Sequence, residues 1–171
     1  MGAVHGVARL PDGGVRVRLT AKERSLLQSL PGQLRPLLAG DAGDVGIRRR
    51  LFPHGYDDAQ QEAEYRDLVG ESLVEERLER LEAFAATLDG GQGGRWSWTV
   101  ELSPDDAHAW LSALNDARLT LGVLLGITDE SQWERGPEQD NPSAVALYYL
   151  GWLQEQLLGA LMQSLDDESS G

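Results

Sequence analysis

Residues 103–126 constrain the fold most, because they combine a clear helix start with a charge inside an apolar stripe. The sequence Ser-Pro-Asp-Asp at 103–106 is a helix N-terminal signal, with a capping hydroxyl, a first-turn proline and two acids that suit the helix dipole. At about 100° per residue, one face collects the large apolar residues Trp110, Leu111, Leu114, Leu121 and Leu125. Arg118 falls on that same face. We therefore predict a core helix that must accommodate a guanidinium.

The Arg118 guanidinium needs an acceptor, because burying an unpaired charge is unfavourable. We predict an ion pair that holds helices together, and the sequence leaves its acid open among Asp57, Asp58, Glu62, Glu71 and Glu75. The alternative is a pocket for an anion or small ligand, lined by Asn115, Arg118, Arg48, Arg49 and Arg50. Gly122 costs the helix about 1 kcal/mol relative to alanine, so we expect a neighbouring element to approach closely there.

The composition limits the class of protein. A chain of 171 residues fits a single domain, which we expect over residues 1–165. The absence of cysteine excludes disulfides and thiolate chemistry. A net charge of −13 argues against nucleic-acid binding. No apolar run approaches the roughly 20 residues of a membrane span or forms a signal peptide, so we expect a cytoplasmic protein without membrane contact.

The first part of the chain predicts a hairpin followed by a helix. Residues 4–10 and 15–19 read as strands around an Asp-Gly-Gly turn at 12–14. Thr20 and Glu23 then form a capping box, and the helix that follows should break or kink at Pro31.

The middle of the chain places a basic triplet before an apolar anchor. Residues 48–50 are three arginines, and Leu51 and Phe52 follow as residues that should fill the core. Residues 57–69 and 71–88 read as helices that are separated or kinked near Gly70.

A strand and a second capped helix come next. Residues 90–94 (Gly-Gly-Gln-Gly-Gly) read as a flexible linker, because they lack the ending of a phosphate-binding loop. The alternation of Trp96, Trp98, Val100 and Leu102 predicts a strand over 96–102. Strand 15–19 and strand 96–102 each lead into a capped helix, and such a repeat could put both strands in one small sheet.

The final helix, expected over 143–165, is apolar on more than one side. It is therefore central to the core or buried between subunits. Residues 1–52 hold nine of the fifteen basic residues and only four acidic ones, which would add complementary contacts in a dimer. We expect a homodimer with Tyr148 and Trp152 as contacts, and a disordered acidic tail over 166–171.

Taken together, these elements predict a mainly α fold with a small antiparallel β-sheet (α+β), a single-domain bundle of about five helices. The catalytic inventory is thin. The three histidines share no local spacing, and no nucleophile elbow, metalloprotease motif or dinucleotide fingerprint occurs. We predict no catalytic residue, no metal site and no cofactor.

Two motifs resemble an actinobacterial family of unknown function. They are Arg50-Leu51-Phe52-Pro53-x-x-Tyr56 and Trp110-Leu111-x-x-Leu114-Asn115-Asp116-x-Arg118-Leu119-x-Leu121-Gly122. We expect structural roles for Leu51, Phe52, Tyr56, Trp110, Leu114 and Gly122. Genes of that family often neighbour the gene for the Clp-protease adaptor ClpS, and some members are labelled as regulators. No activity comes with the family.

Two functions follow as hypotheses. The first is a non-enzymatic cytosolic interaction or regulatory protein, linked to regulated proteolysis through a Clp protease component. The second is a small-ligand or anion-binding domain, or an enzyme, that uses the region of Asn115 and Arg118.

Overall fold

The computed structural model describes residues 6–40, 47, 51–52, 58–126 and 141–169. In chain order, the described elements are two strands, two helices, two strands and two helices. The elements are β1 (Gly6–Arg9), β2 (Val15–Thr20), α1 (Ala21–Ala39), α3 (Ala59–Asp89), β3 (Gln92–Gly93), β4 (Ser97–Leu102), α4 (Pro104–Leu124) and α6 (Pro142–Ser169). The α+β prediction, with mainly helical structure and a small antiparallel sheet, is confirmed.

The sheet has the order β1-β2-β4-β3, with antiparallel neighbours throughout. Side chains of β2 alternate: Val15, Val17 and Leu19 are buried, whereas Arg16 faces solvent and pairs with Glu101 on β4 at 2.7 Å. The β1–β2 hairpin is the predicted one, and its turn is closed by the Gly14 amide, which donates to the Asp12 carboxylate at 2.9 Å.

Two strand-to-helix units share this sheet. Thr20 caps α1 through a complete capping box with Glu23, and Ser103 caps α4 by accepting from the Asp106 amide at 3.1 Å. The strands that precede these caps, β2 and β4, are direct neighbours, with Val17 opposite Val100. The predicted repeat therefore does place both strands in one sheet.

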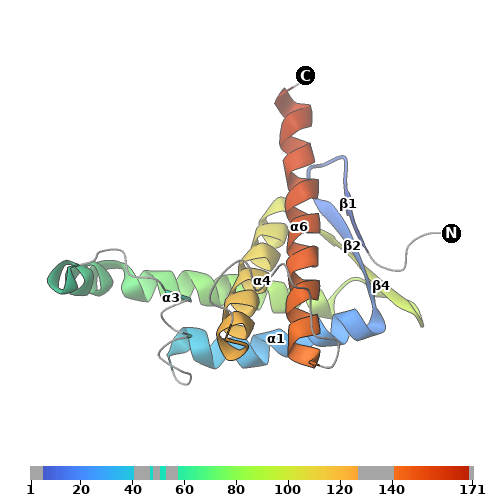
Figure 1. Cartoon of the computed structure of the whole chain (residues 1–171). Helices are drawn as coiled ribbons and strands as arrows, with labels where there is room; N and C mark the ends of the chain where they lie inside the picture. Colours follow the sequence, from blue (N-terminus) through green and yellow to red (C-terminus); the bar gives the residue numbers. More distant parts are fainter. Residues whose placement is uncertain (1–5, 41–46, 48–50, 53–57, 127–140, 170–171) are drawn as a thin grey trace.

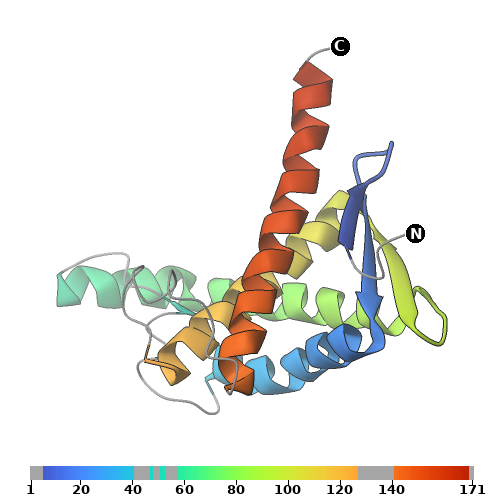
Figure 2. The ribbon, with the colours of Figure 1, turned by 45° about the vertical axis from the view of Figure 1, so that its right-hand side comes forward.

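The helices cover one face of the sheet. The buried side chains of β2 and β4 lie on the same face, since Val15 is opposite Leu102 and Leu19 is opposite Trp98. Figure 1 shows α1, α3, α4 and α6 gathered on one side of the strands, with α6 crossing α4 and its C-terminal end reaching beyond the sheet. Figure 2 shows that β1 is the strand nearest to α6.

Helix α1 continues through Pro31 as one element, so the predicted break is wrong, and the kink that was its alternative stays a prediction. Four leucines on both sides of this proline are buried in the core: Leu27, Leu30, Leu34 and Leu38. Burying each leucine contributes roughly 1.5–3 kcal/mol. Together they outweigh the cost of about 3 kcal/mol for a proline inside a helix.

The chain between residues 58 and 102 differs from the prediction at two glycine-containing places. Helix α3 runs across Gly70 as one element, so the two predicted helices are not separated. The predicted flexible linker contains β3, which pairs with β4. Gly91 has φ +75°, and an added Cβ would lie 2.6 Å from the Thr99 carbonyl oxygen. Glycine is required there by the positive φ and by the close approach of the β4 backbone.

Helix α6 starts at Pro142, near the predicted position, and continues to Ser169. It therefore includes Asp166, Asp167 and Glu168, for which the sequence suggested a disordered tail. The extent of the single domain stays a prediction.

Candidate functional site

Helices α3 and α4 are joined by an ion pair at the centre of the second motif. Arg77 on α3 donates from Nε to Asp116 Oδ2 at 3.2 Å and from Nη2 to Asp116 Oδ1. The Arg77 guanidinium also lies 5.2 Å from the centre of the Phe52 ring. Arg77 thus connects the Leu-Phe-Pro motif with the Leu-Asn-Asp-x-Arg motif, which are far apart in the sequence.

Burial dominates the electrostatics of Asp116. Its side chain is 2% exposed, whereas that of Arg77 is 23% exposed. Burial raises the pKa of Asp116 above its ordinary value of 3.8, and the bonds and charge of Arg77, with the charge of Arg80, oppose that rise. The carboxylate is therefore held in an environment that favours its protonated form more than water does.

Arg118 packs against α6. Its Nη1 donates to Gln154 Oε1 at 2.5 Å. An added Cβ at Gly151 would lie 3.4 Å from Nε and 3.5 Å from Cζ of Arg118. Gly151 thus leaves the room that the guanidinium occupies. This partner on α6 is a neutral amide, and the predicted carboxylate partner of Arg118 stays a prediction.

Gly122 is buried, but the described residues do not supply the expected close approach, which stays a prediction. No described atom lies within 4 Å of an ideal Cβ at this glycine. On the facing helix α6, Gly151 does have a close neighbour, the Arg118 guanidinium.

Several predicted structural residues do lie in the core. Leu51, Phe52, Trp110 and Leu114 are buried. Trp110 packs edge-on against Phe84 at 5.0 Å, and its Nε1 donates to Thr87 Oγ1 at 2.7 Å. These contacts fix α3 against α4.

Of the residues of the predicted anion pocket, the structure describes Asn115 and Arg118. Asn115 is exposed, while Arg118 is half-buried against α6. Arg48, Arg49, Arg50 and Tyr56 lie outside the described residues. The ligand role of these arginines and of Asn115 stays a prediction.

Sequence reasoning missed Asp116 because it counted only large side chains as apolar. The buried face of α4 also contains Ala109, Ala113 and Ala117. When these alanines are counted, the centre of the buried face lies nearer to Asp116. Leu111 and Leu121 are only partly buried. An acid flanked by small residues at helical spacing was the available signal.

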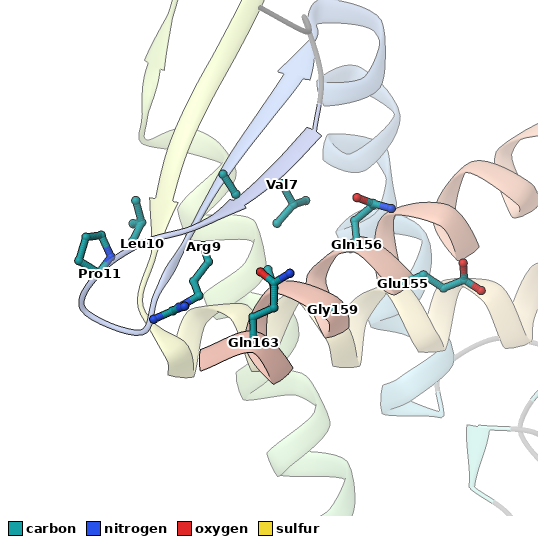
Figure 3. A pocket seen from close by; sticks show the side chains of 10 residues that line it. Val7, Arg9, Leu10, Pro11, Glu155, Gln156, Gly159 and Gln163 are labelled. Atoms are coloured by element: carbon teal, nitrogen blue, oxygen red, sulfur yellow. The ribbon is translucent and has the colours of Figure 1, made fainter. Parts of the chain in front are cut away.

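A cavity of about 710 Å³ opens between β1 and α6. Its strand side is formed by residues 7–11 and its helix side by Glu155, Gln156, Gly159, Ala160 and Gln163. Figure 3 shows Arg9 near Gln163 at one end of this cavity and Glu155 at the other end. The cavity runs beside an outer strand of the sheet.

Two exposed apolar side chains of α6 lie in the same helical segment as the cavity lining, although they are not themselves part of that lining. Leu158 is 43% exposed and Met162 is 61% exposed. They are four residues apart and so lie on one face of the helix. We call Leu158, Met162 and the cavity lining the α6–β1 face.

The predicted dimer contacts lie elsewhere on α6. Trp152 is partly buried against the core and stacks on Tyr149, with ring centres 5.9 Å apart. Burial and the nearby Glu23 carboxylate raise the pKa of Tyr149 above its ordinary value of 10.0. Tyr148 is also half-buried. Their role between subunits stays a prediction.

The described residues define a regular α+β domain without a recognisable catalytic centre. Within them, no group of three or more histidines and acids could hold a metal ion. No helix of this part combines the length and apolar content that crossing a membrane requires.

The chain belongs to the family described as domain of unknown function DUF2017, whose model matches residues 4–161. It is 42% identical over 78 residues to the oxidative stress regulator AosR of Mycobacterium tuberculosis, which covers 42% of this chain and 32% of that protein. It is 34% identical over 131 residues to the putative oxidative stress regulator AosR of Mycobacterium leprae, covering 67% of this chain and 57% of the relative. No solved structure matches the chain.

These relatives confirm part of the resemblance drawn from the two motifs. The family is one of unknown function, and mycobacterial relatives of the chain carry the name of oxidative stress regulators. The chain spans well under two thirds of the length of either relative.

Proposed function

We propose that this chain is a non-enzymatic cytoplasmic regulatory protein that binds a protein partner through the α6–β1 face. The observation that carries the proposal is the exposure of Leu158 and Met162 on the segment of α6 that also forms one wall of an open cavity. Adjacent exposed apolar side chains next to a hollow are typical of interaction surfaces. The flexible thioether of Met162 suits a surface that adapts to its partner.

The edge of the sheet adds a second means of binding. Leu10 exchanges hydrogen bonds with the turn toward β2, with its amide 2.8 Å from the Gly14 carbonyl oxygen. By the alternation of an antiparallel ladder, the peptide groups of Val7 and Arg9 point away from β2. An extended segment of a partner could pair along this edge while its apolar side chains contact α6.

The names of the relatives support a regulatory role. Both relatives are called oxidative stress regulators, and this name does not refer to an enzymatic reaction. The chain's charge of −13 disfavours an acidic partner and nucleic acid.

Two partners are proposed as candidates. One is a Clp protease component, which the gene neighbourhood of the resembling family suggests. The other is a second copy of this chain. Light scattering at micromolar concentration separates them in part, because a monomer has a mass near 18.7 kDa.

A matched pair of variants tests the face. In Leu158→Ser/Met162→Ser the apolar side chains are removed without changing the net charge. The control, Leu73→Ser/Val145→Ser, removes two other exposed apolar side chains, on α3 and near the start of α6. The proposal expects a pull-down from cytosol to recover a partner with the parent and the control but to lose it with the first variant. Equal recovery with both variants would reject this face.

A further inference from the structure

A second cavity lies where α1, α4 and the start of α6 meet. Its volume is about 270 Å³, and most of its lining is apolar, including Leu30, Leu34, Ala117, Leu121 and Ala146. None of the described residues that line it is charged. In a chain with 25% charged residues, such a lining excludes an ionic ligand and favours a neutral one.

The lining also holds the exposed polar residues Ser29, Gln33 and Ser143, and it contains one buried polar residue, Thr120. Thr120 is 8% exposed, and its Oγ1 has no hydrogen-bond partner in the described structure. Buried hydroxyl groups are nearly always paired, because leaving one unpaired lowers stability. A ligand atom in the cavity would supply the missing partner.

We infer that this cavity binds a small neutral molecule with an apolar body and one hydroxyl group, which pairs with Thr120 Oγ1. Benzene occupies an apolar protein cavity of about 150 Å³. A volume of about 270 Å³ therefore admits a substituted ring of the phenol type. Leu124, which lines the cavity and is 66% exposed, places its mouth at the surface. This inference does not rest on the partner proposed above, because the two sites share no lining residue.

The test uses two probes that differ only by a hydroxyl group, 4-methylphenol and toluene. We expect saturable binding of 4-methylphenol by calorimetry, and chemical-shift changes confined to α1, α4 and the start of α6. Thr120→Val keeps the shape and removes the hydroxyl. It should weaken 4-methylphenol binding by about fivefold, the equivalent of one hydrogen bond, and leave toluene binding unchanged. Ala146→Leu should abolish binding of both probes, and Val145→Leu on the same helix should abolish neither.

A second measurement needs no ligand. Removing an unpaired buried hydroxyl should raise the melting temperature of Thr120→Val by about 2–4 °C. A lower melting temperature would mean that the hydroxyl is already paired, and would overturn the inference. The absence of saturable 4-methylphenol binding, or equal affinity in the parent and Thr120→Val, would overturn it as well.

Discussion

Arg77 and Asp116 form a two-point ion pair in which the acid is almost fully enclosed and the base is partly open to solvent. The pair joins α3 to α4, and Phe52 covers the guanidinium from the other side. Because the two partners differ in burial, removing one is not equivalent to removing the other. The first prediction uses this difference.

Arg77→Ala should destabilise the fold more than Asp116→Ala. The first change strands a buried carboxylate, which costs about 3–5 kcal/mol. The second leaves a guanidinium that water already reaches, so its cost should be smaller by roughly 1–2 kcal/mol. Urea denaturation at neutral pH measures the free energy of unfolding of both variants. An equal loss in the two variants would contradict the difference in burial between Asp116 and Arg77.

Stability should depend on pH through Asp116. Its pKa is raised in the folded state, so the fold binds this proton more tightly than the unfolded chain does. The contribution of Asp116 to stability is therefore present at low pH and declines as pH rises from about 4 through the raised pKa. The free energy of unfolding of the parent minus that of Asp116→Asn, plotted against pH, should fall across this window. If this free-energy difference rose with pH, the pKa of Asp116 would be lowered in the folded state rather than raised.

Glycines on α4 and α6 should respond in opposite ways to larger side chains. Gly122→Ala should stabilise by up to about 1 kcal/mol, because helix propensity improves and no described atom lies near the new methyl group. Gly151→Leu should destabilise by about 1–3 kcal/mol, because its side chain would displace the Arg118 guanidinium. Thermal melts of the two variants decide this. If Gly122→Ala lowered the melting temperature, a neighbouring element would have to lie close to Gly122, as expected from the sequence.

Arg118 and Gln154 should be energetically coupled. A double-mutant cycle with Arg118→Ala and Gln154→Ala should give a coupling energy of about 1.5–3 kcal/mol, the range for a hydrogen bond to a charged group. Additive effects within about 0.5 kcal/mol would mean that this bond does not hold α4 to α6.

The sequence was informative where the pattern was local. Alternation in 15–19 and 96–102, and the caps at Thr20 and Ser103, led to the sheet and to both strand-to-helix units. Helix ends and breaks were less predictable. Leucines on both sides of Pro31 stabilise α1 through tertiary packing, which no local rule contains.

The candidate site was less predictable, because it depends on contacts between distant segments. The motif around Arg118 was correctly singled out as unusual, but its enclosed ion pair belongs to Asp116 and Arg77, which are 39 residues apart. The α6–β1 face depends on how α6 crosses the edge of the sheet. Neither the exposure of Met162 nor the cavity follows from residue spacing alone.

Hydrogen–deuterium exchange with the recovered partner tests the central claim most directly. The account predicts that the partner protects β1 and the segment of α6 around residues 155–163, and leaves the middle of α3 near Leu73 unchanged. If the partner protected α3 and left β1 and α6 exchanging at the rate of the free protein, the α6–β1 face would not be the binding surface.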